Sequence, residues 1–193
     1  MIKLTDEEVK NILPLKGPTF DEVEKYLDKY NNEYIVIKCG GSVLVDKNLF
    51  NNFINDISIL NKLGFIPIII HGGGKRISNK LDEAGIKSDF INGLRVTDKK
   101  SLNVVEEVLN KFNKEITEAL KENNCDSQGI TNKQNNILIV EQENQELGFV
   151  GAPKEISQSI IEKVVKEKKV PVIAPLGLDK NNQVFNINAD TAA

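Results

Sequence analysis

The sequence predicts an α/β fold of three layers, an αβα sandwich in which helices cover both faces of a mainly parallel central sheet. Three observations favour this class. Strand-like and helix-like segments alternate from residue 33 onward. Residues 66–70 form an apolar run without polar alternation, which is typical of a parallel strand covered on both faces. Residues 98–122 carry apolar side chains at helical spacing, which predicts one long amphipathic helix.

Composition narrows the class of protein. The chain has 193 residues, a formal net charge of −3 and 40% hydrophobic residues, which suits one domain with a buried core. The mildly acidic balance argues against a nucleic-acid partner, and the apolar runs are far shorter than the ~20 residues of a membrane helix, so no membrane partner is expected. No His/Cys cluster has zinc spacing, so no metal site is expected. The two cysteines form no CxxC motif, which favours a reducing cytoplasm.

Residues 1–31 are expected to form a separate helical arm, and residues 32–193 one domain. Within the arm, Thr19 followed three residues later by Glu22 is a capping-box pattern that predicts the start of a helix. The apolar positions of that helix recur at helical spacing: Val23, Tyr26, Leu27 and Tyr30. Because such a stripe must cover something, the arm is expected to pack on its own domain or on a neighbouring subunit.

In the first half of the domain, β-type apolar runs alternate with helical patterns. Phe50 and Ile57 lie on one face of the first helical pattern, and Ile77 begins the apolar face of the second. Asn92-Gly93 is a turn dipeptide that favours a hairpin. The expected elements are, in order, a strand at 34–37, a helix at about 46–63, the strand at 66–70, a helix at about 75–84 and a short strand or hairpin at 90–96.

The second half opens with the longest helix, at about 98–122, for which Thr97 is the expected cap. Its apolar residues are spaced three or four apart: Leu102, Val105, Leu109, Phe112, Ile116 and Ala119. The next two β-type runs are joined by a link too short for a crossover helix, so they are expected to be antiparallel. The remaining elements are those two strands at 137–140 and 148–150, a helix at about 157–168, strands at 170–174 and 184–187, and a last helix capped by Asn188.

Two glycine-rich turns follow two of these strands: Lys38-Cys39-Gly40-Gly41 and His71-Gly72-Gly73-Gly74. Ligands in open α/β sheets bind beyond the carboxyl ends of the strands. Successive glycines let backbone N–H groups approach phosphate oxygens, and Lys38 adds a charge suited to a phosphoryl group. No P-loop and no GxGxxG motif is present, and a tight turn without a ligand is the alternative for each. His71, the only histidine, is expected to be structural.

Polar residues that could bind a charged ligand appear at two further places. Arg76 and Arg95 are the only arginines, and a guanidinium can hold a carboxylate or phosphate with two hydrogen bonds. Asn186, Asn188 and Asp190 alternate in a strand-like stretch, so their side chains can point the same way. The alternative, a turn with a helix N-cap, accounts for Asn188 or Asp190 but not for all three.

Taken in order, these motifs resemble those of the amino-acid kinase family over about residues 33–193. The glycine turns are shared across that family. Further runs of residues are similar to motifs of those family members that phosphorylate N-acetyl-L-glutamate in arginine biosynthesis. Those runs are Gly93-Leu94-Arg95-Val96-Thr97, Gly148-Phe149-Val150-Gly151 and Asn186-Ile187-Asn188-Ala189-Asp190.

The resemblance implies the fold of that family and phosphoryl transfer from MgATP to the side-chain carboxylate of N-acetyl-L-glutamate, with Mg²⁺ held mainly by the nucleotide phosphates. It implies that Lys38 stabilises the moving phosphoryl group and that Asp190 orients catalytic lysines. Phosphate oxygens would be held at Gly40, Gly41, Gly72 and Gly73. The substrate would be bound by Gly73, Gly74, Arg95, Asn186 and Asn188, with Arg95 at the carboxylate that does not react.

The resemblance also implies that a nucleotide-binding lobe follows Ala193, so that this chain is the acyl-amino-acid-binding lobe. The arm resembles an N-terminal helix that links dimers into hexamers in arginine-inhibited members. The helix at 98–122 is the expected dimer contact, so a homodimer or a hexamer is expected. The family's Gly-x-x-Gly-Lys-Asp stretch is altered here, since Asn132 and Gln134 replace its second Gly and its Asp.

Two alternatives remain open at this point. One is a non-catalytic module that binds an acylamino acid or serves assembly, and the other is a sister kinase that acts on aspartate or glutamate. For the expected reaction, the acceptor carboxylate is already ionised at neutral pH, since Glu titrates near ~4.3. The requirements of that reaction are therefore positioning and charge neutralisation, not a general base.

Overall fold

Four parallel strands form the central sheet of this structure, a computed structural model that describes residues 5–13, 17–30, 33–41 and 45–193. They pair in the order β1 (Tyr34–Cys39), β2 (Ile66–His71), β8 (Val170–Ile173) and β5 (Ser127–Ile130). β1 and β2 are in register, with Cys39 opposite His71, so the two glycine turns leave the sheet side by side. The predicted parallel sheet is therefore confirmed.

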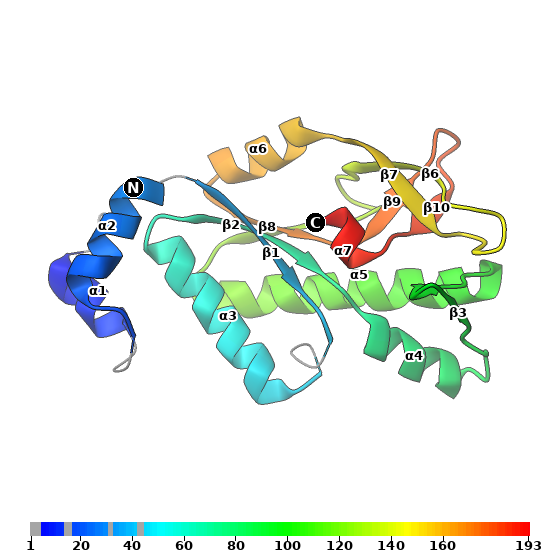
Figure 1. The fold of residues 1–193 in the computed structure, drawn as a ribbon, viewed down its shortest axis with the longest axis horizontal. Helices are drawn as coiled ribbons and strands as arrows, with labels where there is room; N and C mark the ends of the chain where they lie inside the picture. The colour runs from blue at the N-terminus through cyan, green and yellow to red at the C-terminus, as the bar shows by residue number, and fades with distance from the viewer. Residues whose placement is uncertain (1–4, 14–16, 31–32, 42–44) are drawn as a thin grey trace.

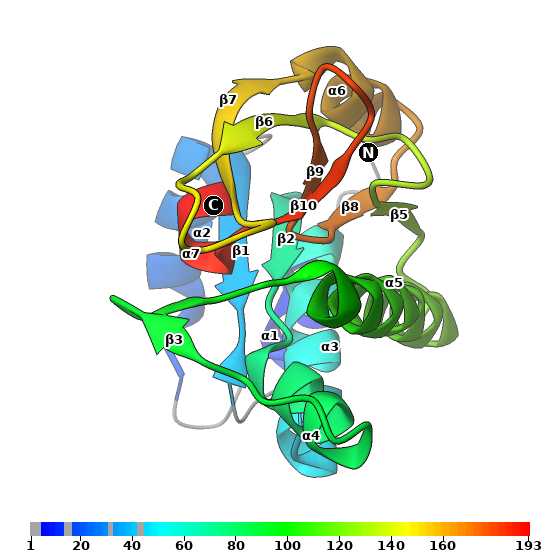
Figure 2. The same ribbon diagram turned by 90° about the vertical axis from the view of Figure 1, so that its right-hand side faces the viewer.

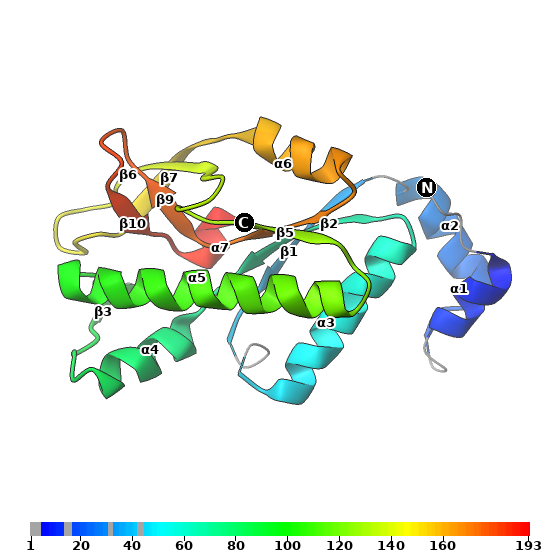
Figure 3. The ribbon, with the colours of Figure 1, turned by 180° about the vertical axis from the view of Figure 1, so that it is seen from behind.

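Helices cover both faces of this sheet and give the three predicted layers. Figures 1 and 3 show α3 and α5 along one face, with α4 beside α5, and α6 along the other face. Their bounds are α3 Lys47–Lys62, α4 Gly74–Glu83, α5 Lys99–Glu122 and α6 Gln158–Lys166. The α/β fold class is confirmed, and each of these four helices lies where the periodicity placed it.

A smaller sheet and a hairpin extend the fold at the carboxyl ends of the parallel strands (Figure 2). The smaller sheet has the order β10 (Val184–Asn186), β9 (Leu176–Leu178), β6 (Leu138–Gln142) and β7 (Gly151–Ile156). The hairpin pairs β3 (Phe90–Ile91) with β4 (Leu94–Arg95) around the expected Asn92-Gly93 turn. A last short helix, α7 (Ala189–Ala192), is capped by Asn188 as predicted.

The helix α5 is the centre of the core. Phe112 and Ile116 are fully buried against β2 and β8, while Leu109 packs with α4. The predicted apolar stripe is confirmed as far as Ile116, and one turn later the fully buried residue is Leu120, with Ala119 only partly buried. A long helix buried along one face in this way fixes the positions of the strands above it.

Several boundaries differ from the prediction, each for a physical reason. Thr97 is not the helix cap: it is fully buried and forms a bridge with Gly148, while Asp98 accepts the Ser101 N–H as the N-cap. A strand was expected at residues 148–150. It begins only at residue 151, as β7, because Gly148 has a left-handed backbone. Two strands, β5 and β9, were not predicted, because they are short and carry few β-type residues.

The N-terminal arm consists of α1 (Asp6–Ile12) and α2 (Phe20–Tyr30), which lie beside the end of the domain opposite the smaller sheet (Figures 1 and 3). The predicted capping box of α2 is present, since Glu22 accepts the Thr19 N–H at 2.9 Å. Of the expected stripe, Val23 is buried, but Tyr26 is 57% exposed and stacks on the exposed Tyr30. The stripe is therefore largely uncovered. The expected boundary between residues 31 and 32 lies outside the described residues.

Within the described part of the chain, no helix combines the length and the apolar character that crossing a membrane requires.

The close approach of Gly148 to Thr97 gives a test of the fold. Gly148 and Gly85 both have φ of +67°, but a Cβ on Gly148 would lie 2.5 Å from the Thr97 carbonyl oxygen, whereas nothing lies within 4 Å of one on Gly85. We expect Gly148→Ala to lower the free energy of unfolding by about 3 kcal/mol and Gly85→Ala by only about 1 kcal/mol, the cost of the left-handed backbone. Urea unfolding at 25 °C measures both; equal losses would contradict this packing.

Candidate active site

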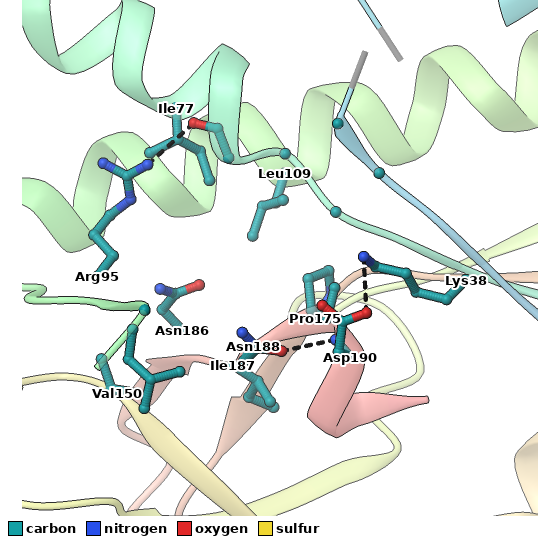
Figure 4. Close-up of a pocket in the computed structure, with 18 of the residues that line it drawn as sticks. Lys38, Ile77, Arg95, Leu109, Val150, Pro175, Asn186, Ile187, Asn188 and Asp190 are labelled. Carbon is teal, nitrogen blue, oxygen red and sulfur yellow. Dashed lines mark hydrogen bonds and ion pairs between the residues drawn. The ribbon is translucent and has the colours of Figure 1, made fainter. Parts of the chain in front are cut away.

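A cavity of about 250 Å³ lies beyond the carboxyl ends of β1 and β2, where the sequence placed a binding site. Its lining comes from both glycine turns, the hairpin and the C-terminal segment (Figure 4). The structure thus brings to one cavity all the site residues that the family resemblance implied: Lys38, Gly40, Gly41, Gly72, Gly73, Gly74, Arg95, Asn186, Asn188 and Asp190. Segments far apart in the sequence therefore meet at a single site.

One end of the cavity carries an ion pair. The Lys38 Nζ lies 2.8 Å from Asp190 Oδ1, and both side chains reach solvent. Lys38 ends up over its own turn because Gly40 leaves room: a Cβ there would lie only 3.2 Å from Nζ. Asp190 is placed by α7, whose first turn is held by the Asn188 side chain. The pair thus fixes an ammonium group at the cavity wall.

The second glycine turn presents backbone to the same cavity. The Gly72 N–H donates to the Cys39 carbonyl at 2.7 Å, which ties the two turns together and occupies the amide that the sequence analysis assigned to phosphate. Gly73 is the N-cap of α4, so the positive end of that helix faces the cavity. The Gly73 N–H has no acceptor among the described residues. A helix start of this kind attracts an anion.

Arg95 lies at the opposite end of the cavity from Lys38 (Figure 4). Although it is only 7% exposed, its guanidinium donates to neutral groups: the Ser88 hydroxyl, the Ser78 hydroxyl at 2.9 Å and the Gly74 carbonyl at 3.0 Å. The guanidinium carbon of Arg95, Cζ, also lies 4.7 Å from the centre of the Phe90 ring. Burial lowers the pKa of Arg95, and the charge of Asp82 opposes this effect. In the described part of the chain no carboxylate forms an ion pair with it.

The two asparagines have different surroundings. The Asn186 Nδ2 donates to Thr97 Oγ1 at 3.4 Å, and that hydroxyl donates to the Arg95 carbonyl at 2.9 Å, so the residues below Arg95 are linked. The Asn188 Oδ1 accepts the N–H groups of Asp190 and Thr191. Asn188 therefore serves as the N-cap that the sequence analysis held as the alternative, while also lining the cavity.

Apolar residues complete the lining, and sequence reasoning did not select them for the site. They are Ile77, Phe90, Leu94, Leu109, Val150, Pro175 and Ile187. Two of them, Ile77 and Leu109, belonged to predicted helix stripes, whose periodicity marks a buried face but cannot show that part of the face borders a cavity. Apart from the exposed Phe90 and the half-buried Leu94, these apolar lining residues are buried in the core.

Two further predicted features lie outside the lining. Asn132 of the altered loop donates to Glu106 of α5 at 3.0 Å, and Lys133 lies 3.2 Å from the same carboxylate, so this loop is tied to the long helix. Arg76 pairs with Glu115 and stacks on Phe112, also on α5. Among the described residues, no group of three or more His, Cys, Asp or Glu side chains could hold a metal ion.

His71 is fully buried at the end of β2 and does not line the cavity. Its Nδ1 lies 3.1 Å from the Gly72 oxygen, and its Nε2 lies 3.2 Å from Asn113 Nδ2. Burial lowers the pKa of His71 to about 4, since the hydrogen bond to Gly72 opposes this only in part and the nearby Arg76 charge adds to it. The ring is therefore neutral at pH 7, and it lies in the core, outside the lining of the cavity.

Comparison with known proteins matches residues 33–193 to the model of the amino acid kinase family. An acetylglutamate kinase from Pelagibacter ubique (strain HTCC1062) is 63% identical over 193 residues, which are 100% of this chain and 67% of that protein. One from Campylobacter jejuni subsp. jejuni serotype O:2 is 38% identical over 178 residues, 92% of this chain and 64% of that protein.

Among solved structures, smu.665 from Streptococcus mutans UA159 matches with a TM-score of 0.73 and 29% sequence identity, over 83% of this chain and 65% of that one. The present chain thus spans about two thirds of the length of the relatives it matches.

The buried His71 predicts how stability depends on pH. Its pKa is about 4 in the folded protein, against an ordinary value of 6.5, so between these values the unfolded chain binds a proton that the folded chain does not. Stability from the neutral ring is therefore present near pH 7 and falls as the pH drops. We expect His71 to account for a loss of about 2 kcal/mol between pH 7 and pH 5.

Urea unfolding at pH 7, 6 and 5 of the wild type and of His71→Gln measures this contribution. Between pH 7 and pH 5, the free energy of unfolding of the variant should fall by about 2 kcal/mol less than that of the wild type, because the Gln side chain does not titrate. If the free energy of unfolding changes with pH in the same way in the two proteins, His71 has the same pKa in the folded and the unfolded chain, which would contradict the prediction.

Proposed function

This chain belongs to the amino acid kinase family, and from that premise we propose that it is the acyl-amino-acid-binding part of an acetylglutamate kinase. The reaction would transfer a phosphoryl group from MgATP to the side-chain carboxylate of N-acetyl-L-glutamate. The relatives named acetylglutamate kinase support this choice of acceptor, because they match along most or all of the chain. Arginine biosynthesis is the corresponding pathway.

The observation that carries the proposal is the buried Arg95 at one end of the cavity, with neutral partners, and Lys38 at the other. Among the described residues Arg95 forms no ion pair, and the charge of Asp82 offsets its burial only in part. A buried charge is costly unless it is paired, so this end of the cavity is suited to an anionic ligand. A guanidinium binds a carboxylate with two parallel hydrogen bonds. A substrate with two carboxylates would therefore place one at Arg95 and present the other near Lys38.

The chemistry requires little more than this placement. The acceptor carboxylate is ionised at neutral pH, so no proton must be removed before it attacks phosphorus. The obstacle is the repulsion between two anions, which positive groups at fixed positions reduce. Lys38, held by Asp190, and the N–H of Gly73 at the start of α4 lie where they would meet the transferred phosphoryl group.

The nucleotide is the second substrate in this proposal, and its Mg²⁺ would be held mainly by the phosphates. Gly40 and Gly41 would border the phosphoryl group together with Gly73, while Gly74, Asn186 and Asn188 would border the acyl amino acid. Gly72 would act by joining the turns, since its N–H is already used. A cytoplasmic location is part of the proposal and is supported by the two cysteines, which are unpaired and buried.

Lys38 gives the central test of the reaction. In the full-length protein we expect Lys38→Met to lower kcat by about 100- to 1000-fold, because it removes a charge that acts on the moving phosphoryl group. The dissociation constant of N-acetyl-L-glutamate should stay within about threefold, since Arg95 holds the other carboxylate. Lys80→Met, which removes an exposed lysine on α4, is the matched control and should change neither quantity.

Isothermal titration calorimetry with N-acetyl-L-glutamate, glutamate and aspartate measures binding, and a coupled ADP assay measures turnover. Binding of N-acetyl-L-glutamate without turnover in the full-length protein would favour a non-catalytic binding module. Heat from aspartate or glutamate but none from N-acetyl-L-glutamate would indicate a sister kinase. An equal loss of binding and turnover in Lys38→Met would contradict the role assigned to Lys38.

Assembly through the arm is a further part of the proposal, with a homodimer or a hexamer as the expected state. The support is the pair of stacked, exposed tyrosines Tyr26 and Tyr30 on α2. Exposed apolar surface of this kind is commonly covered by another subunit. The arm would then join copies of the protein, while the domain carries the site.

We expect that deletion of residues 1–31 lowers the mass of the full-length protein in solution to that of a smaller oligomer. The double variant Tyr26→Ser/Tyr30→Ser should do the same while leaving the arm in place, because it removes only the two exposed aromatic rings of the stripe. Multi-angle light scattering measures the mass. An unchanged mass in both variants would mean that the arm does not join subunits.

A further inference from the structure

The hydrogen bonds around His71 determine which ring nitrogen carries the proton. Asn113 Nδ2 lies 2.8 Å from the Val172 carbonyl oxygen and 3.2 Å from His71 Nε2. Because a carbonyl only accepts, the side-chain atom facing Val172 must be the amide nitrogen and not its oxygen. The second proton of that nitrogen then points to Nε2, which must accept. The proton of the neutral ring is therefore on Nδ1, and Nδ1–H donates to the Gly72 carbonyl at 3.1 Å.

That bond fixes the orientation of a peptide group in the second glycine turn. The Gly72 carbonyl and the Gly73 N–H belong to the same planar trans peptide, so they point in opposite directions. With the carbonyl held by the buried ring, the Gly73 N–H points away from the core. Gly72 and Gly73 line the cavity, and the Gly73 N–H has no acceptor among the described residues.

We propose that His71 and Asn113 are positioning residues that aim the Gly73 N–H at the transferred phosphoryl group. The inference rests on the proposed phosphoryl transfer, because in that reaction the Gly73 N–H would donate to the transferred phosphoryl group. His71 does not touch the substrate: it acts through the peptide group that follows it. Asn113 acts one step further back, by keeping the proton of His71 on the nitrogen that faces Gly72.

The packing of α5 supports this arrangement. Leu109 lies one helical turn before Asn113, and its Cδ2 would lie only 2.8 Å from a Cβ on Gly73. The turn therefore rests directly on the helix that supplies Asn113. The His71 ring is further confined by Phe112, whose ring meets it edge-on with centres 5.2 Å apart. Glycine is flexible by itself, so a turn of three glycines keeps one orientation only where its surroundings impose it.

The first experiment does not depend on activity. Nitrogen-15 NMR of the His71 imidazole in the full-length protein at pH 7 should show a protonated Nδ1 and an unprotonated Nε2. In Asn113→Leu this preference should weaken, because the donor to Nε2 is gone. A wild-type ring protonated on Nε2 would overturn the inference, since Gly72 would then face a lone pair.

The second experiment separates positioning from stability by kinetics. We expect His71→Leu, which keeps the approximate size but has no donor, to lower kcat by roughly 10- to 100-fold while the KM for N-acetyl-L-glutamate changes little. His71→Asn should restore kcat to near the wild-type value, because its amide nitrogen can take the place of Nδ1. Ser58→Ala is the matched control: it removes a buried hydrogen bond to the Ile54 carbonyl within α3, and should lower the Tm without changing kcat.

The outcomes distinguish this inference from the proposed function. If the wild-type protein phosphorylates N-acetyl-L-glutamate but His71→Leu lowers only the Tm, His71 is structural and the inference fails alone. If the wild-type protein does not phosphorylate N-acetyl-L-glutamate while the ring is protonated on Nδ1, the proposed function fails and the Gly73 amide is aimed at another anion. Loss of kcat in His71→Leu without restoration in His71→Asn would also overturn the inference.

Discussion

The buried guanidinium of Arg95 is the interaction on which the rest of the site depends. A cation that is removed from water and held by hydroxyl and carbonyl oxygens keeps its charge, but recovers only part of its hydration. The hairpin that carries Arg95 is linked through Thr97 to Asn186 of β10, so the side chain stays at the cavity wall. In the proposed complex, a carboxylate of the ligand would complete the solvation of this cation, which would provide both affinity and orientation.

In the proposed reaction, the long helix α5 would support the groups that meet the second anion, the transferred phosphoryl group. It contacts the second glycine turn through Leu109 and the last residue of β2 through Asn113. The first turn is joined to the second by the hydrogen bond from Gly72 to Cys39. The helix α5 thus determines the conformation of the two glycine turns, which are flexible by themselves. Precise backbone placement near a phosphoryl group requires support of this kind.

Much of the fold could be predicted because periodicity reports burial directly. The apolar run at 66–70 and the apolar stripe of α5 are each suited to a buried environment, and both lie where expected. β5 could not be found this way, since Ser127, Gln128 and Gly129 are not apolar. Ser127 instead donates to the Thr117 carbonyl of α5, and Gly129 packs closely against Asn113. The error at Thr97 has the same origin: a good N-cap residue is also a good buried hydroxyl, and only tertiary contacts distinguish the two.

The members of the candidate site could also be predicted, because motifs of charged residues and glycines are visible in the sequence. Their individual tasks could not. That Gly72 donates to Cys39 depends on the register between β1 and β2, and that Asn188 caps α7 depends on the turn after β10. The apolar wall was invisible for a simpler reason, since a core residue beside a cavity, such as Leu109, has the same pattern as any other.

The ion pair between Lys38 and Asp190 joins the first strand of the domain to the last helix. A contact between segments so distant in the chain can form only after the intervening loop has been closed, and the entropy of closure must be met by other contacts first. The ion pair is therefore expected to form after contacts that are closer in sequence, and during synthesis on the ribosome it cannot exist until residue 190 has emerged. Any ligand that bridges these two segments would favour the completed fold over partly folded forms.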